Sequence, residues 1–261
     1  MDMDKTVRFA QHLAEAERAG RGVSPLTELD ANLTIEEAYQ VQLHTIQNKV
    51  ESGQKIVGKK IGLTSRAMQT LLGVDQPDYG HLLDDMVVEN GEEIAFSRVL
   101  QPRVEAEIAF VLKKNLVGPK VTTSDVLLAT DYVLPALEIV DSRVANWKIK
   151  LQDTVADNAS SGLYVLGGKP LRVNQLDMSL TGVVFYKNGE IMNTGVGAAA
   201  LGHPATCVAW LANKLSEFGI HLQAGEVILS GALSAAVNAE PGDHFHARFA
   251  HLGEVSVRFS K

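Results

Sequence analysis

The chain has 261 residues, of which 46% are hydrophobic and 21% are charged, and its formal net charge is −7. This length and composition predict one large domain, or one domain with a smaller appendage, that can bury a proper core. The acidic balance and the lack of a basic tract exclude nucleic acid as the expected partner.

The single cysteine and the apolar stretches narrow the class of protein further. One cysteine, Cys207, excludes an internal disulfide and a cysteine-rich metal site, and its apolar helical context predicts an inert core thiol. The charged residues 1–5 have no apolar stretch behind them, so we expect no signal peptide. Residues 196–213 are uncharged but contain glycines and a proline, which favours a loop and a buried helix over a membrane span. We therefore expect a cytoplasmic protein with no membrane partner.

The N-terminal third has mostly helical patterns. Residues 4–20 carry apolar side chains at helical spacing, and glycines end the pattern. Thr34 and Glu37 form a capping-box pattern, in which each side chain accepts a hydrogen bond from the backbone N–H of the other residue. This pattern predicts the start of a second helix, which continues to about Ser52.

Residues 55–65 predict a strand that contains two adjacent lysines. By alternation, Lys60 lies between Gly58 and Gly62 on one face, whereas Lys59 lies among apolar residues on the other face. The two glycines leave space in which a small ligand can approach the Lys60 ammonium group. The alternative is an edge strand in which both lysines are solvated and prevent aggregation.

Turn-forming residues follow this strand. Ser65 predicts the N-cap of a short helix that ends at Gly73. Residues 75–80 are dense in turn formers and predict a loop that brings Asp78 and a phenol to a surface. Asn90-Gly91, between two short apolar segments, predicts a β-hairpin.

Residues 101–112 carry the strongest functional pattern in the chain. When this segment is read as a strand, one face is wholly apolar, and the other carries Arg103, Glu105 and Glu107 followed by apolar residues. Two adjacent carboxylates in a partly buried place repel each other, so protonation, cations or a metal ion must neutralise them. The alternative without a ligand is a sheet face on which Arg103 pairs with both acids.

A further carboxylate stands alone in an apolar strand pattern. Glu138 lies in the middle of residues 133–140, where a buried glutamate is costly unless positive charge meets it. Together with Glu105 and Glu107, it makes a candidate all-oxygen site, which favours Mg²⁺ or Mn²⁺ over zinc. The sequence does not establish that the two strands are neighbours.

The later part of the chain is rich in strand patterns at short spacing. Asn188-Gly189 predicts another hairpin, Pro204 opens a helix, and three closing strands follow. These patterns predict an α+β protein with a rolled antiparallel or mixed β-structure. We assign residues 1–75 to a mostly helical N-terminal region and residues 76–261 to a β-rich domain that carries the candidate metal site.

Other motifs are less specific. The Gly-Val-Gly sequence at 195–197 lacks the third glycine and the βαβ context of a dinucleotide site. The histidines have no spacing typical of zinc ligands, and we expect them to be structural or exposed. Residues 153–162 form a small polar loop that offers Asp157, Asn158 and two hydroxyl groups, and loops of this composition are common.

Several motifs, taken in order, resemble a known family. They are Gly-Lys-Lys-Ile-Gly at 58–62, Gln-Pro-Asp-Tyr-Gly at 76–80, Glu-Ala-Glu at 105–107, Pro-Ala-Leu-Glu at 135–138, the polar loop at 153–160 and Leu-Gly-His-Pro at 201–204. Together they resemble the 2-keto-4-pentenoate (2-hydroxypenta-2,4-dienoate) hydratases, within the hydratase/decarboxylase family of the fumarylacetoacetate-hydrolase superfamily. The resemblance covers nearly the whole chain. It implies a rolled mixed β-structure in the catalytic domain and a homo-oligomer.

The resemblance also implies the metal ligands. In that family the two acids of the Glu-x-Glu strand and the acid of the Pro-Ala-Leu-Glu strand bind a divalent metal, usually Mg²⁺ or Mn²⁺. At the matching positions this chain has Glu105, Glu107 and Glu138. These are the same three residues that the burial pattern indicates.

Four further residues are expected around the metal. The resemblance implies that Lys60 lines the active site, that Asp78 approaches it and that the polar loop ending in Ser160 contacts the substrate. We assign proton handling to Lys60, whose pKa can fall near a cation in a poorly solvated pocket, and activation of water to Asp78. Arg103 either holds a substrate carboxylate or balances the acids.

The implied reaction is metal-dependent hydration of 2-hydroxypenta-2,4-dienoate, a small unsaturated 2-hydroxy acid, to 4-hydroxy-2-oxopentanoate in aromatic meta-cleavage catabolism. Alternatives in the same family are a 4-oxalocrotonate (2-oxo-3-hexenedioate) decarboxylase and a 2-oxohept-4-ene-1,7-dioate hydratase. An alternative of another class is a non-catalytic partner subunit, since hydratases and decarboxylases of these pathways associate. The complete set of acids, together with Lys60, argues against that alternative.

Overall fold

The computed structural model describes residues 3–261, so Met1 and Asp2 of the charged N-terminal stretch lie outside the described residues. The α-helices in this range are α1 (Met3–Ala19), α2 (Leu26–Leu29), α3 (Ile35–Glu51), α4 (Arg66–Leu72), α5 (Thr123–Ala129), α6 (Leu151–Ala156) and α7 (Pro204–Ser216). The strands are β1 (Ile56–Gly62), β2 (Asp78–Leu83), β3 (Val87–Val88), β4 (Glu93–Ile94), β5 (Arg103–Leu112), β6 (Thr130–Val140), β7 (Ser161–Leu166), β8 (Gly182–Lys187), β9 (Glu190–Val196), β10 (Val227–Leu229), β11 (Val237–Asn238), β12 (His244–Phe249) and β13 (Gly253–Phe259).

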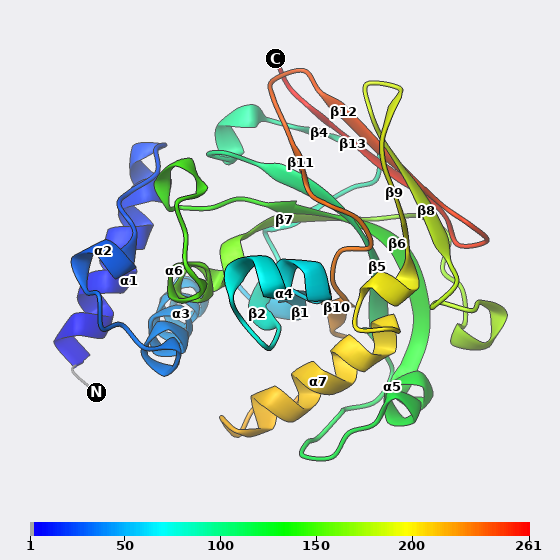
Figure 1. Cartoon of the computed structure of the whole chain (residues 1–261), viewed down its shortest axis with the longest axis horizontal. Helices are drawn as coiled ribbons and strands as arrows, with labels where there is room; N and C mark the ends of the chain where they lie inside the picture. Colours follow the sequence, from blue (N-terminus) through cyan, green and yellow to red (C-terminus); the bar gives the residue numbers. More distant parts are fainter. Residues whose placement is uncertain (1–2) are drawn as a thin grey trace.

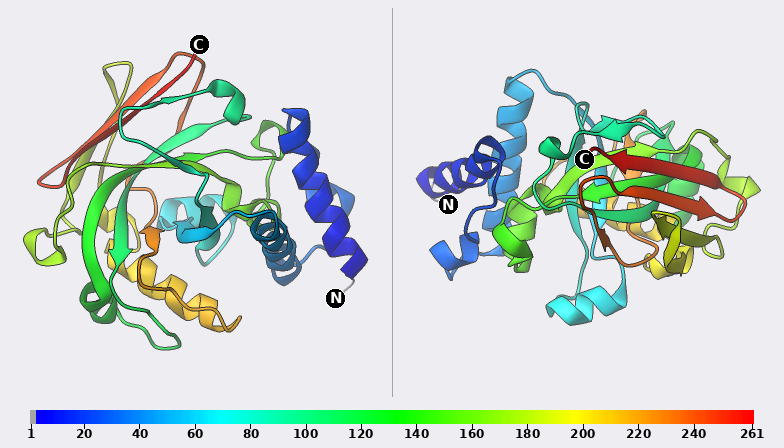
Figure 2. Two further views of the ribbon diagram at one scale, coloured as in Figure 1. Left: turned by 180° about the vertical axis from the view of Figure 1, so that it is seen from behind. Right: turned by 90° about the horizontal axis from the view of Figure 1, so that it is seen from above.

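The strands form two mixed sheets. The larger sheet has the order β2-β1-β10-β5-β6-β7-β3, with β11 paired to β5, and the smaller sheet has the order β4-β13-β12-β8-β9. Most pairs are antiparallel, but β1 runs parallel to β10, β3 to β7 and β4 to β13. The long strands β5 and β6 bend strongly, so the larger sheet curls toward the smaller one (Figures 1 and 2). This arrangement confirms the expected α+β, rolled mixed β-structure.

The apolar face of β5 lies in the main core, as the alternation predicts. Val104, Ala106, Ile108 and Phe110 are fully buried and belong to one cluster with aromatic residues of the smaller sheet. Full burial of a large apolar side chain contributes about 1.5–3 kcal/mol. The core therefore fixes the orientation of β5 and directs its opposite face, which carries the two glutamates, away from the space between the sheets.

The N-terminal helices group at one side of the molecule, together with α6 (Figure 1). The predicted capping box begins α3: the Thr34 hydroxyl accepts from the Glu37 N–H at 3.2 Å, and the Glu37 carboxylate accepts from the Thr34 N–H at 3.1 Å. The predicted division at residue 75 stays a prediction, and β1 and β2 are hydrogen-bonded to each other across it. No helix within residues 3–261 is long and apolar enough to cross a membrane.

One predicted hairpin is correct and the other is wrong. Asn188 and Gly189 join β8 to β9 as an antiparallel hairpin, and both have positive φ. The hairpin predicted at Asn90-Gly91 does not form, because β3 pairs with β7 in the larger sheet and β4 pairs with β13 in the smaller one. The Asn90 side chain and the Gly91 N–H instead bond the backbone of Ser256, so this turn connects the two sheets.

Two further expectations near the candidate site are corrected. The segment predicted as a surface loop is largely strand: Asp78 is the first residue of β2, and the side chains of this strand are buried. The alternative in which the lysines of β1 are solvated is also wrong, because Lys59 and Lys60 are each 3% exposed. Strand β2 covers the outer edge of β1, and this tertiary pairing is absent from local turn propensity.

Candidate active site

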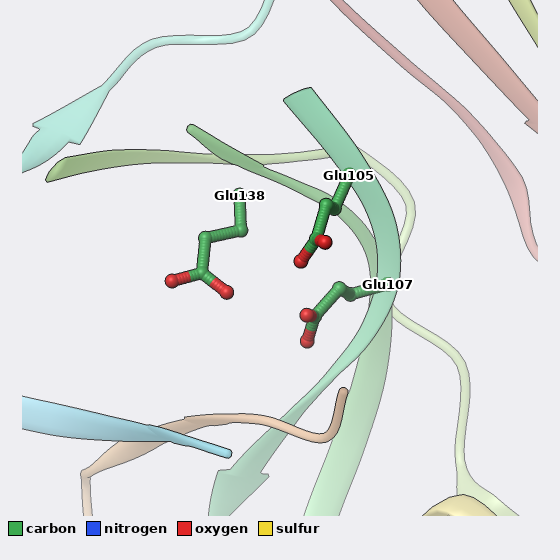
Figure 3. Close-up of side chains that lie close together, drawn as sticks. All are labelled: Glu105, Glu107 and Glu138. Atoms are coloured by element: carbon green, nitrogen blue, oxygen red, sulfur yellow. The ribbon is translucent and has the colours of Figure 1, made fainter. Parts of the chain in front are cut away.

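The three predicted glutamates converge on one face of the larger sheet. In the antiparallel β5–β6 pair, Glu105 lies directly opposite Glu138, and Glu107 lies two residues farther along β5. Residues directly opposite each other, and residues two apart on one strand, share a face. Ligand oxygens of the three carboxylates lie within 4.8 Å of one another, and the carboxylates point toward a common space (Figure 3).

Burial makes this cluster unstable as three free anions. Glu107 and Glu138 are fully buried, whereas Glu105 is partly exposed. Burial, followed by the charge of Glu138, raises the pKa of Glu105 to about 7 and that of Glu107 well above its usual value. Burial also raises the pKa of Glu138. The cluster therefore needs protons or cations to offset its charge.

Some of the buried carboxylate oxygens in the cluster lack a hydrogen-bond donor among residues 3–261. Glu107 Oε2 accepts from the Gly231 N–H at 2.7 Å, but Glu107 Oε1 and Glu138 Oε2 are buried without a hydrogen bond among residues 3–261, and Glu138 Oε1 has the Lys60 ammonium group 3.1 Å away. Unsatisfied buried acceptors are costly, and a bound cation would satisfy them together. Because the donors are all oxygen, these residues fit Mg²⁺ or Mn²⁺.

Lys60 projects into this cluster. It pairs with Leu229 of β10, which in turn pairs with Ala109 of β5, so Lys60 shares the sheet face that carries Glu107. Its Nζ lies at an ion-pair distance of 3.1 Å from Glu138 Oε1 and donates to the carbonyl oxygen of Ala159, also at 3.1 Å.

The acids around Lys60 act on its charge state. Burial alone lowers the pKa of Lys60, but the nearby carboxylates, first Glu138 and then Asp78, outweigh burial and raise it. The expected fall of the Lys60 pKa refers to the cluster with a bound cation and stays a prediction. In the cluster without a metal ion, these acids favour the protonated form of Lys60.

Asp78 completes the cluster from β2. It pairs with Gly62 of β1, on the face that Lys60 also occupies, and its Oδ1 is buried with no hydrogen-bond partner in the described part of the chain. Burial raises the pKa of Asp78 to about 6, although the charge of Lys60 opposes the shift. A Cβ atom on Gly62 would lie 2.2 Å from Asp78 Oδ1, so only glycine leaves room for the carboxylate in this position.

Arg103 and Ser160 lie at the periphery. The Arg103 guanidinium stacks 4.2 Å from the Trp147 ring, and no ion pair joins it to a glutamate in the described part of the chain. Lys60 makes the ion pair with Glu138, but the charge of Arg103 still opposes the rise in the pKa of Glu105, so its balancing of the acids stays a prediction. The Ser160 hydroxyl lies 3.1 Å from that of Thr154, and Ser160 follows the residue that accepts from Lys60.

Two buried ion pairs near the cluster were not predicted. Arg143 pairs with Asp157 beneath the polar loop, and Lys59 pairs with Glu226 at 2.6 Å on the other face of β1. The sequence pattern drew attention to Asp157 as a loop acid, but it gave no sign of its partner. Both pairs join segments that are distant in sequence or lie in irregular structure, so periodicity does not reveal them.

Comparisons with known proteins relate this chain to one protein family, to hydratases and to a decarboxylase. A family model described as "Fumarylacetoacetate (FAA) hydrolase C-terminal" matches residues 58–260. The chain is 50% identical over 221 residues to a 2-hydroxypent-2,4-dienoate hydratase of Pseudomonas putida, with 84% of this chain and 100% of the relative covered. It is 48% identical over 250 residues to a 2-keto-4-pentenoate hydratase of Paraburkholderia xenovorans (strain LB400), with 96% and 93% covered. A solved 4-oxalocrotonate decarboxylase from Pseudomonas putida G7, complexed with magnesium and adipate, superimposes with a TM-score of 0.96 at 41% identity, covering 99% of this chain and 98% of that one.

Proposed function

The chain belongs to the fumarylacetoacetate hydrolase C-terminal family, and we propose that it is a divalent-metal-dependent hydratase. The proposed reaction adds water to 2-hydroxypenta-2,4-dienoate and yields 4-hydroxy-2-oxopentanoate. The convergence of three carboxylates, two of them fully buried, beside a buried lysine is the observation that carries this proposal. The names of relatives that are 48–50% identical support the choice of substrate.

Glu105, Glu107 and Glu138 are the proposed metal ligands. The unsatisfied oxygens of Glu107 and Glu138 support this assignment, as does the magnesium in the solved relative. When bound, Mg²⁺ or Mn²⁺ would supply a Lewis acid and a template for the carboxylate and 2-oxygen of the substrate.

Lys60 and Asp78 are the proposed proton-transfer groups. Hydration moves the proton of the 2-hydroxyl group to carbon 5, which leaves an α,β-unsaturated ketone. Water then adds at carbon 4, loses one proton to a base, and carbon 3 takes up a proton. The Lys60 ammonium group is the proposed proton donor, since the surrounding acids keep it protonated. Asp78 is the proposed base for the water, since its raised pKa of about 6 and its unpaired Oδ1 suit proton transfer near neutral pH.

Arg103 and Ser160 are proposed substrate contacts. Stacking on Trp147 restricts the Arg103 guanidinium, which is then preorganised to meet a carboxylate. We further expect a cytoplasmic homo-oligomer that can associate with another enzyme of the same pathway.

Removal of the metal is expected to abolish turnover. A chelator in excess should stop the loss of dienol absorbance, and Mg²⁺ should restore it. The same ion should stabilise the folded protein, by about 2.7 kcal/mol at a concentration of 100 times its Kd. Thermal unfolding with and without Mg²⁺ measures this effect. Undiminished turnover in chelator, with no bound metal detected, would contradict the proposal.

A comparison of two substrates separates the hydratase from the decarboxylase. The solved relative with a TM-score of 0.96 is a 4-oxalocrotonate decarboxylase, so this alternative has structural support. We expect hydration of 2-hydroxypenta-2,4-dienoate to exceed carbon dioxide release from 2-oxo-3-hexenedioate, measured on one preparation with Mg²⁺. Release of carbon dioxide without hydration would assign the chain to the decarboxylases.

A substitution at Gly62 tests the placement of Asp78. Gly62→Ala puts a Cβ where the Asp78 carboxylate lies, so we expect the carboxylate to shift and kcat to fall by about 10²-fold. Gly168→Ala is the matched control, since a Cβ there meets nothing within 4 Å. Equal kcat values for the two variants would remove Asp78 from the mechanism.

A further inference from the structure

The loop that faces Lys60 has an unusual backbone. Asn158, Ala159 and Ser160 have φ values of 54°, 51° and 50°, so three consecutive non-glycine residues occupy the left-handed region. Side chains disfavour this region, alanine and serine more than asparagine. Such a conformation persists only where the surrounding structure imposes it.

Arg143 makes contacts that can impose this conformation. It is 7% exposed and forms an ion pair through Nε with the Asp157 carboxylate, while Nη2 donates to the Asp157 carbonyl oxygen. Its Nη1 donates to the carbonyl oxygen of Ser161 at 2.8 Å, and its backbone N–H donates to Asp157 Oδ2 at 2.9 Å. A single guanidinium group therefore ties the residue before the loop to the residue after it.

The loop in turn contacts Lys60 directly and contacts the strand that carries Asp78. The Ala159 carbonyl oxygen accepts from Lys60 Nζ at 3.1 Å. The Asn158 side chain accepts from the N–H of His81 at 2.7 Å and donates to its carbonyl oxygen at 2.9 Å, which ties the loop to β2, the strand of Asp78. The position of the loop therefore affects Lys60 and Asp78 together.

We propose that Arg143 is a positioning residue for the reaction, acting through the loop 158–160 to orient the Lys60 ammonium group. No ion pair or hydrogen bond joins Arg143 to the glutamate cluster within residues 3–261. This role requires N–H donors that point in several directions. A lysine at position 143 would lack the planar fork of the guanidinium group and could not make the same set of contacts. The inference deepens the proposed function and rests on it.

The test compares Arg143→Lys with a structural control. Asp243→Asn is the control, because the Asp243 carboxylate is also buried but pairs with Lys187 at 2.8 Å and accepts from the Glu240 N–H beside the smaller sheet. We expect Arg143→Lys to lower kcat per metal-loaded site by about 10²-fold, with the Kd for Mn²⁺ within about threefold of wild type. The control should lower only the Tm. An equal kcat per site in both variants would overturn the proposal.

Two additions keep the test decisive. If Arg143→Lys does not fold, Asp157→Asn is used, since it weakens the same ion pair from the other side and the same loss of kcat is expected. If the wild-type protein hydrates nothing, the proposed function fails, and amide hydrogen exchange of residues 158–161 then tests Arg143 alone. Faster exchange there in the Arg143 variant, and not in Asp243→Asn, supports the positioning role; unchanged exchange contradicts it.

Discussion

Replacing Glu138 with glutamine is expected to abolish metal-dependent hydration while the protein stays folded. The amide keeps the volume of the side chain but removes one of three anionic donors, so metal affinity and the Lewis-acid contribution are both lost. A contribution of several kcal/mol to transition-state stabilisation corresponds to a fall in kcat of at least about 10³-fold. Lys60 keeps nearby negative charge from Asp78, Glu105 and Glu107, so we expect no large loss of stability in the metal-free protein.

The control for this variant is Glu226→Gln. Glu226 also forms a buried ion pair with a lysine of β1, but that lysine is Lys59, on the opposite face of the strand. Removing one partner of a buried pair costs about 3 kcal/mol, so this variant should lose stability and keep its turnover per folded site. Titration with Mn²⁺ measures the metal affinity, thermal unfolding measures the stability, and steady-state kinetics measure kcat in both variants. Wild-type turnover in Glu138→Gln would remove Glu138 from the metal site.

Replacing Lys60 with methionine is expected to lower turnover without weakening metal binding. Loss of a positioned proton donor typically lowers the rate by about 10²–10⁴-fold. The ammonium group offsets part of the charge of the glutamates, so its removal leaves the cluster more negative and the metal affinity unchanged or higher. Steady-state kinetics with saturating Mg²⁺ and direct titration with Mn²⁺ separate the two quantities.

Lys59→Met is the matched control for this second prediction. Lys59 is as buried as its neighbour, and its loss leaves Glu226 without its partner. We expect lower stability and a wild-type kcat per folded site. If Lys59→Met and Lys60→Met reduced kcat equally, the loss would reflect damage to β1 rather than loss of a proton donor.

The sequence alone predicted which residues of strand β5 face the core and which face the candidate metal site. Period-two alternation placed Glu105 and Glu107 on the face opposite an apolar one, and the structure has them there. The isolated acid in residues 133–140 indicated a third buried carboxylate. The pairing that brings Glu138 opposite Glu105 is a tertiary choice of neighbour and register, which no local pattern specifies.

The remaining differences arise where tertiary contacts override local propensity. Asp78 follows turn-forming residues, yet it begins a buried strand because β1 offers a partner along its whole length. Asn90-Gly91 turns the chain as its residue types predict, but its two flanking strands pair with longer strands in different sheets. Arg143 lies in an irregular segment, and its proposed positioning role rests on contacts with Asp157 and Ser161 on either side of the loop, which no local sequence pattern reveals.

Anomalous diffraction from crystals grown with Mn²⁺ tests the central claim most directly. The account predicts one strong anomalous peak among the carboxylates of Glu105, Glu107 and Glu138, at oxygen distances of about 2.0–2.3 Å, and its loss in Glu138→Gln. A peak elsewhere, with the three carboxylates free of metal, would contradict the account and leave their mutual burial to be explained by protons and Lys60 alone.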